Sequence, residues 1–163
     1  MSIRIEAYTE KYRPKVIDMI LGIQRKEFGI AIDEKDQPDL SQINKVYQQG
    51  NGNFWIALND EEVCGSIALL DIGHSAVALR KMFVDSRQRG SGIARQLMNV
   101  MLGWCAERNI KTIYLGTIDV MKAAHRFYEK NGFTAIDKGS LPVYFPLMKV
   151  DNVFYKYSFN NNS

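Results

Sequence analysis

Two spacings of apolar residues run along the chain, and together they predict a mixture of strands and helices. Alternating or short continuous apolar runs, as at Ile3–Tyr8 and Ala76–Val84, predict strands. Apolar residues three and four positions apart predict helices, most clearly after Gly92. We expect strands at residues 3–8, 54–58, 63–72, 76–84, 112–117, 133–136 and 152–157, and helices at about 14–29, 39–49, 93–108 and 123–130.

Residues that favour turns and helix ends separate these elements. Pro14 fits the first turn of a helix, and Asp39 or Ser41 fits the N-cap of the next one. Asn131-Gly132 fits a helix C-terminus. No repeat or low-complexity linker interrupts the pattern, so we expect a single domain over residues 1–159 and a frayed tail over residues 160–163.

Composition and charge narrow the class of protein. The 163 residues are 46% apolar and 24% charged, as in ordinary globular proteins. A net charge of +3 without a basic block does not favour nucleic acid or an anionic membrane as partner. Cys64 and Cys105 lie in apolar runs, which predicts two buried thiols rather than a disulfide framework and fits a cytoplasmic location. The two cysteines and the two histidines do not have the spacing typical of metal ligands, so we expect no metal site.

The most informative stretch is the glycine-rich turn at residues 89–94, between the strand ending at Val84 and the long helix. Glycine lets an anion approach the backbone, and a helix N-terminus presents free N–H groups and a partial positive charge. The turn therefore predicts binding of a phosphorylated ligand. It is not a P-loop, because no Gly-Lys-Ser/Thr follows, and repeated βαβ units are missing for a dinucleotide fold.

A second motif, at residues 124–133, lies downstream and reads Ala-His-Arg-Phe-Tyr-Glu-Lys-Asn-Gly-Phe. In this order the two motifs resemble those of the GNAT superfamily of acyl-CoA-dependent N-acyltransferases. The glycine motif has two possible registers, starting at Arg87 or Arg89, and Val84 favours Arg89 because the family's strand-ending valine lies five residues before the arginine. The resemblance implies an α/β fold, a central mixed sheet flanked by helices in the order β-α-α-β-β-β-α-β-α-β-β.

The resemblance also implies a donor site and a reaction. Acetyl-CoA would bind with its pyrophosphate on the turn and its pantetheine arm along residues 82–84. A backbone N–H near Val84 would polarise the thioester carbonyl, and Tyr128 would protonate the departing sulfur. The implied donor-site residues are Met82, Phe83, Val84, Arg89, Gly90, Ser91, Gly92, Ile93, Ala94, Arg95, Phe127 and Lys130.

Several positions depart from the family pattern. Met121 stands where the family often has a pantetheine-binding asparagine, and only apolar residues occupy positions 77–79, where relatives carry a glutamate base. The available carboxylates, Glu27, Asp71 and Asp119, give no compelling alternative, so the general base stays open. Because the family's asparagine and glutamate are absent, a second hypothesis stays open: the chain is a non-catalytic acyl-CoA-binding sensor or interaction domain.

For the acceptor, the resemblance points to the first two helices and the loop between the last two strands. Those segments offer Gln24, Glu27, Phe28 and Tyr144, the last within an apolar loop at residues 141–148. Glu27 could hold a cationic amine, so we expect a small amine or amino-acid-like acceptor, with a peptide or protein amine next. The sequence leaves monomer and homodimer both open.

Overall fold

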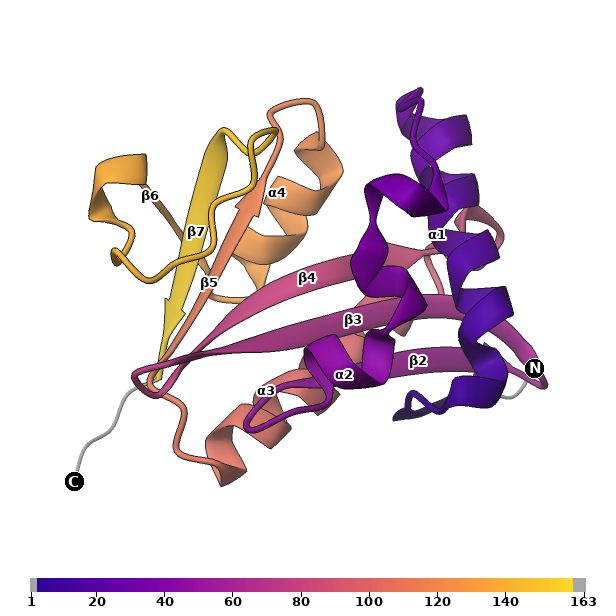
Figure 1. Cartoon of the computed structure of the whole chain (residues 1–163), viewed down its shortest axis with the longest axis horizontal. Helices are drawn as coiled ribbons and strands as arrows, with labels where there is room; N and C mark the ends of the chain where they lie inside the picture. The colour runs from indigo at the N-terminus through magenta and orange to yellow at the C-terminus, as the bar shows by residue number, and fades with distance from the viewer. Residues whose placement is uncertain (1–2, 160–163) are drawn as a thin grey trace.

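The computed structural model describes residues 3–159, and the tail at 160–163 that we expected to fray lies outside the described residues. Helices pack on both sides of a central sheet, as Figure 1 shows. The strands are β1 (Ile3–Ala7), β2 (Asn53–Asn59), β3 (Glu62–Gly73), β4 (Ala76–Val84), β5 (Thr112–Thr117), β6 (Thr134–Ile136) and β7 (Val153–Ser158). The α-helices are α1 (Arg13–Phe28), α2 (Ile43–Tyr47), α3 (Ile93–Glu107) and α4 (Lys122–Lys130).

All strands join one seven-stranded sheet in the order β1-β2-β3-β4-β5-β7-β6, which confirms the expected mixed α/β fold. Every neighbouring pair is antiparallel except β4 and β5, which run parallel. One face of the sheet packs on α1 and α2 through a core that includes Val16, Ile20 and Phe54. The other face packs on α3 and α4 through a second core that includes Leu97 and Tyr128. Helices therefore cover both faces of the sheet.

The parallel strands at the centre of the sheet separate after three paired residues, and the divergence between their backbones is called the cleft. β4 and β5 are paired only over Ala76–Ala78 and Thr112–Tyr114, although both strands continue beyond these residues. In Figure 1 the two strands start side by side and then diverge, with β5 and β7 turning away from β4. Beyond Ala78 one edge of β4 has no strand beside it, so its backbone N–H and C=O groups face the cleft.

A glycine in β3 lets the long helix α3 approach the sheet closely. A Cβ atom added at Gly65 would lie 3.1 Å from Leu97 Cδ1 and 3.2 Å from Ile93 Cγ2, closer than side chains normally pack. Ile93 and Leu97 belong to the first turns of α3 and are almost fully buried. Gly65 thus fixes the height of the helix N-terminus above the sheet, next to the end of β4.

The expected helix at residues 39–49 is wrong in extent. The segment forms a 3-10 turn at Pro38–Ser41 and then the five-residue α2, whose N-cap is Gln42 rather than Asp39 or Ser41. The carboxylate of Asp39 instead accepts a hydrogen bond from the Tyr47 hydroxyl at 2.6 Å. The contacts of this half-buried side chain with Tyr47 and Lys81 override the local capping preference.

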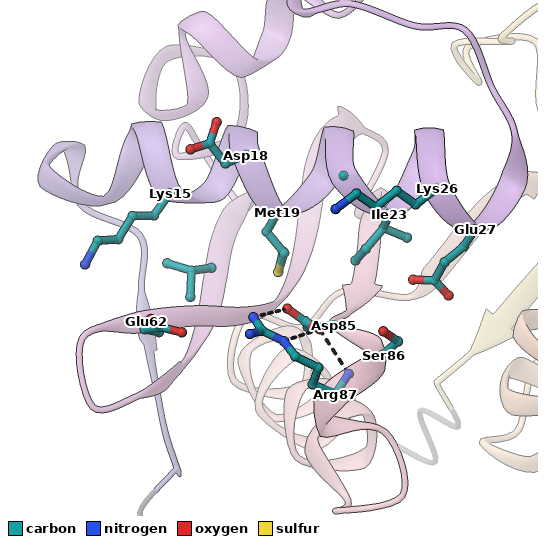
Figure 2. A pocket seen from close by; sticks show the side chains of 12 residues that line it. Lys15, Asp18, Met19, Ile23, Lys26, Glu27, Glu62, Asp85, Ser86 and Arg87 are labelled. Carbon is teal, nitrogen blue, oxygen red and sulfur yellow. Dashed lines mark hydrogen bonds and ion pairs between the residues drawn. The ribbon is translucent and has the colours of Figure 1, made fainter.

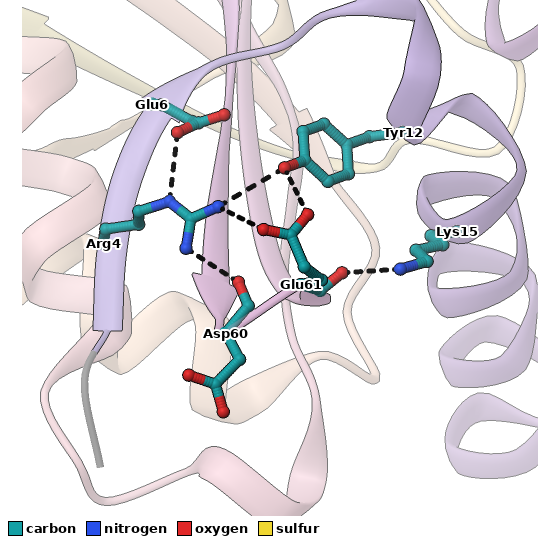
Figure 3. A network of polar contacts seen from close by, with 6 residues as sticks. All are labelled: Arg4, Glu6, Tyr12, Lys15, Asp60 and Glu61. Carbon is teal, nitrogen blue, oxygen red and sulfur yellow. Dashed lines mark hydrogen bonds and ion pairs between the residues drawn. The ribbon is translucent and has the colours of Figure 1, made fainter.

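A polar network fixes the start of the chain to the hairpin between β2 and β3 (Figure 3). Arg4 donates to Asp60 O at 2.8 Å and to Glu61 Oε1 at 3.1 Å, and Tyr12 donates to Glu61 Oε2 at 3.0 Å. These donors lower the pKa of Glu61, with the Tyr12 hydroxyl the larger cause. The network joins residues 4 and 12 to the hairpin, so it holds β1 and the following turn in place.

Candidate active site

The glycine-rich turn has the conformation that an anion site needs. Gly90 and Gly92 both have a φ of +84°, in the left-handed region that side chains disfavour. Gly92 is the N-cap of α3, so the amides of the next residues lie in the first helical turn and have no carbonyl partner one turn before them. The turn therefore directs several N–H groups and the positive end of α3 toward one point.

Arg89 closes the turn rather than pointing away from it. Its Nε donates to Val84 O at 3.2 Å, and its guanidinium forms an ion pair with Glu27 of α1. The structure thus brings together two predicted site residues that the sequence had assigned to different substrates. Glu27 lies at the donor turn, and its carboxylate is already paired with a cation.

The donor residues on β4 lie along the free edge of the cleft, next to a bulge. Ser66 pairs with Phe83, but Ala68 pairs with Arg80, so Lys81 and Met82 together face the single residue between them on β3. Lys81 adopts a φ of +53°, which is rare for a residue with a side chain. The bulge changes which side chains of β4 point to each face and leaves the backbone at Met82 to Val84 on the cleft edge.

Tyr128 lies under the cleft in the core of the α3–α4 face. The ring is 6% exposed and packs against Phe133 and Tyr155, with ring centroids 5.7 and 6.0 Å apart. Burial raises its pKa, and the negative charge of Asp151 raises it further. The phenol is therefore protonated at all working pH values. None of the hydrogen bonds found within residues 3–159 involves its hydroxyl, which is free to donate to a ligand.

The remaining residues predicted to bind the acyl donor differ in how exposed their side chains are. Phe127 packs partly buried against the same core as Tyr128, while Arg95 and Lys130 are exposed on α3 and α4. Ser91 donates from its hydroxyl to Gln88 O within the turn. Ile93 is buried under the helix and Ala94 is half-buried, so both reach the ligand side through their amides alone.

The predicted acceptor residues do not form one group. Gln24 is buried and exchanges two hydrogen bonds with Gln37, of 3.2 and 2.8 Å. Phe28 packs partly buried against the α1–α2 core. Tyr144 stacks on His74 with ring centroids 3.9 Å apart, in the turn between β3 and β4. That turn precedes the paired ends of β4 and β5, so Tyr144 lies away from Gln24 and Phe28.

A connected set of partly buried polar side chains lies on the α1–α2 face of the sheet and was not predicted from the sequence. Lys81 donates to Gln37 and forms an ion pair of 3.3 Å with Asp39, which also accepts from Tyr47. Burial lowers the pKa of Lys81, and Asp39 partly restores it. A signal existed in the sequence, since Arg80 and Lys81 are adjacent charges inside an apolar strand. Strict alternation would bury one of them on each face, so the pair indicated a bulge.

Two further charged groups flank the open end of the cleft, and neither was expected there. Arg80 donates from Nη2 to Pro146 O at 3.3 Å. Asp151, at the end of the loop before β7, is half-buried with its carboxylate against Gly116 of β5. Burial raises the pKa of Asp151, and the charge of Arg80 opposes that shift. The position of Asp151 was not predictable from the sequence, because a loop of irregular structure has no periodicity.

A separate groove lies between α1 and the turn that follows β4 (Figure 2). Met19 and Ile23 point from α1 into it, while Asp85 and Arg87 on the opposite wall hydrogen bond to each other. The groove carries charges of both signs and its lining does not include Tyr128, Arg80 or Asp151. It borders the donor turn through Glu27 and Ser86, but the groups suited to chemistry lie in the cleft instead.

No group of three or more His, Cys, Asp or Glu side chains within residues 3–159 could hold a metal ion. None of the helices described there combines the length and hydropathy needed to cross a bilayer.

A comparison with known protein families finds a match that covers most of the helices and strands of this chain. A family model described as "Acetyltransferase (GNAT) family" matches residues 17–133. N-acetylaspartate synthetase from Homo sapiens is 38% identical over 97 residues, which are 58% of this chain and 32% of that protein. The chain thus spans about a third of the length of this curated relative.

Solved structures resemble the whole described chain. An acetyltransferase of the GNAT family from Staphylococcus aureus Mu50 superposes with a TM-score of 0.92 at 42% identity, covering 96% of this chain and 99% of that one. A PaiA N-acetyltransferase from Thermoplasma acidophilum, solved in complex with coenzyme A, superposes with a TM-score of 0.73. The latter shares 18% identity over 98% of this chain and 100% of that one, which shows the fold alone.

Proposed function

Since this chain belongs to the acetyltransferase (GNAT) family, we propose that it moves an acetyl group from acetyl-CoA to the primary amine of a small, amino-acid-like molecule. The family expected from the two sequence motifs is confirmed by the match over residues 17–133. The name of the human relative, N-acetylaspartate synthetase, supports an amino acid as acceptor. The coenzyme A bound to the Thermoplasma protein supports the same donor here.

The single observation that carries the proposal is the cleft between β4 and β5, with the glycine turn at one end of β4 and Tyr128 beneath it. The free edge of β4 can hydrogen bond to the pantetheine amides as an added strand would. The amides from Gly90 to Ala94 would hold the pyrophosphate. The thioester would then lie between the strands, in reach of groups from both faces of the sheet.

The reaction is a direct attack of the neutral amine on the thioester carbonyl carbon. The C–N bond forms as the C–S bond breaks, the amine nitrogen loses a proton, and the sulfur leaves as a thiolate that becomes the thiol of coenzyme A. A backbone N–H near Val84 would stabilise the developing oxyanion. Tyr128, kept protonated by its raised pKa, would donate to the departing sulfur.

The test is release of coenzyme A thiol from acetyl-CoA in the presence of a panel of free amines, amino acids and short peptides. We expect turnover with at least one small amine or amino acid. Binding of acetyl-CoA without turnover of any amine would contradict the proposal and favour the non-catalytic sensor. Turnover of peptides alone would contradict the small acceptor but not the transferase.

A further inference from the structure

We infer that Arg80 and Asp151 form a two-point acceptor site in which Arg80 holds the carboxylate of an α-amino acid and Asp151 takes the proton from its amine. This inference rests on the proposed acetyl transfer and names the acceptor class and the general base for it. It is carried by the placement of both groups relative to the cleft.

Strand register places the two groups opposite each other. The last parallel pair is Ala78 with Tyr114, and two residues further along each strand are Arg80 and Gly116. These positions are therefore level with each other, one on each side of the opening. Asp151 covers Gly116, because a Cβ added there would lie 2.5 Å from Asp151 Oδ2. A guanidinium and a carboxylate thus flank the cleft where the strands first separate.

Both groups lie on the α1–α2 face of the sheet, which is the face opposite Tyr128. Ala78 and Tyr114 pack with Phe145 of the β6–β7 loop, and Arg80 donates to the next residue of that loop, Pro146. Tyr128 belongs instead to the core on the α3–α4 side. An acceptor on one face and a donating phenol on the other would approach the thioester from opposite sides.

The anchoring of Asp151 is mainly through its backbone. Its N–H donates to Met148 O at 3.2 Å, and the N–H of the next residue, Asn152, donates to Thr117 O at 2.9 Å. Within residues 3–159 no hydrogen bond or ion pair engages its side chain, and none of the ion pairs there joins it to Arg80. The carboxylate is therefore held in position while its oxygens are available to a ligand.

The charged neighbours of Asp151 suit a base. Arg80 from β4 and the phenol of Tyr128 from α4 are the titratable groups whose interaction with it is resolved. Burial raises the pKa of Asp151 and Arg80 opposes this shift, so the raised value reflects desolvation. A carboxylate with a raised pKa accepts a proton more readily than an exposed one. The proton passes from the attacking nitrogen to Asp151 and then to solvent.

The charges at Arg80 and Asp151 argue for an amino acid rather than a simple amine as the acceptor. Arg80 and Asp151 are of opposite sign yet not in contact, so a zwitterion can bridge them with its carboxylate at Arg80 and its nitrogen at Asp151. Lys81, which could compete for the carboxylate, is already paired with Asp39. An acceptor lacking the carboxylate would leave the guanidinium without an anionic partner, because its hydrogen bond to Pro146 O is to a neutral group.

The experiment compares purified wild-type protein with Arg80→Gln, Asp151→Asn and the matched control Asp137→Asn, which alters an exposed aspartate of the same loop. The probes are the twenty standard amino acids and, for each one turned over, the amine that lacks its carboxylate. Thiol release gives kcat and KM, while calorimetric binding of coenzyme A and thermal unfolding report the donor site and the fold.

In wild type we expect the amino acid to be preferred over its carboxylate-free amine. Arg80→Gln should raise KM for the amino acid by about 10- to 100-fold, as for loss of a hydrogen bond to a charged group, and leave that for the amine nearly unchanged. Asp151→Asn should lower kcat for both by about 100-fold and remove the acidic limb of the pH profile. Asp137→Asn should change neither.

A third variant tests Asp151 as the general base by moving its carboxylate without removing it. In Gly116→Ala the added methyl group must displace the whole Asp151 side chain, because Oδ2, Cγ and Cβ would lie 2.5, 3.0 and 3.1 Å from it, and thermal unfolding reports whether the fold survives. We expect a fall in kcat in the same direction as Asp151→Asn, with the aspartate still present. Retained coenzyme A binding is required for that result to count as support.

Two results would overturn the inference while leaving acetyl transfer intact. One is an unchanged preference for the amino acid in Arg80→Gln, and the other is an unchanged kcat and pH profile in Asp151→Asn. Failure of wild type to acetylate any amine is a different result, because it contradicts the transferase itself.

Discussion

The donor and acceptor sides of the cleft are built from different parts of the chain and by different means. The proposed donor site uses mainly backbone groups between Met82 and Arg95, which come from one continuous strand–turn–helix segment. The proposed acceptor site uses the side chains of Arg80 and Asp151, which come from distant segments. A backbone site needs only a local turn with a few glycines, whereas a side-chain site depends on the whole fold to assemble it.

The difference implies that a substitution can impair binding of the acyl donor without affecting binding of the acceptor, and the reverse. The largest effect is expected at Tyr128, which acts in the reaction between them. Tyr128→Phe removes the hydroxyl without changing the packing of the ring against Phe133 and Tyr155. We expect kcat to fall by about 100-fold or more, with coenzyme A binding and the KM of the acceptor little changed. Steady-state thiol release gives both constants. An unchanged kcat would remove the phenol from the mechanism.

The next effect should be confined to the donor side. Gly92→Ala forces a side chain into a φ of +84°, at an energy of about 1–2 kcal/mol. We expect weaker acetyl-CoA binding by roughly 10-fold, because 1.4 kcal/mol corresponds to a factor of ten. The KM of the amine should not move. Calorimetry with coenzyme A measures the first quantity, and Gly103→Ala, on the same helix with open space around it, is the control.

Glu27 tests where the boundary between the two sides lies. The ion pair with Arg89 assigns Glu27 to the donor turn, whereas the sequence favoured a role in holding the amine. Glu27→Gln should therefore weaken acetyl-CoA binding by a few-fold at most, since a partly exposed ion pair contributes about 0.2–1 kcal/mol. A rise in the acceptor KM with unchanged acetyl-CoA binding would return Glu27 to the acceptor side.

The smallest effect concerns stability and pH. The raised pKa of Asp151 means that the folded state favours the protonated carboxyl, so its stabilising contribution is lost as pH rises from the unfolded-state value through the folded one. At neutral pH the carboxylate therefore destabilises the fold. Asp151→Asn should be at least as stable as wild type at pH 7, and the difference should shrink toward pH 3. Urea unfolding across this range measures it, and a loss of stability at pH 7 would indicate a structural role.

The same contrast explains what could be predicted from the sequence. The strand–turn–helix at residues 76–108 was predictable because its apolar periodicity and glycines are local features. The choice of Arg89 over Arg87 rested on the distance to Val84, and in the structure Arg89 donates to Val84 O. Its pairing with Glu27, which is a contact between distant segments, was not predictable.

Elements whose shape depends on tertiary contacts were predicted less well. The helix expected at residues 39–49 is shorter, because the chain first forms a 3-10 turn at Pro38–Ser41 and Asp39 contacts Tyr47 and Lys81 instead of capping a helix. Asp151 lies in an irregular loop, and only the separation of β4 from β5 gives its position a meaning. The residues proposed to bind the acceptor could therefore be identified only from the structure.

The most direct test of the central claim, that the cleft between β4 and β5 holds the acyl donor, is a crystal structure with bound acetyl-CoA. The account predicts the pyrophosphate on the amides of Gly90 to Ala94, the pantetheine along the free edge of β4, and the thioester sulfur within hydrogen-bond reach of Tyr128. Acetyl-CoA bound in the groove between α1 and Arg87, with the cleft empty, would contradict it.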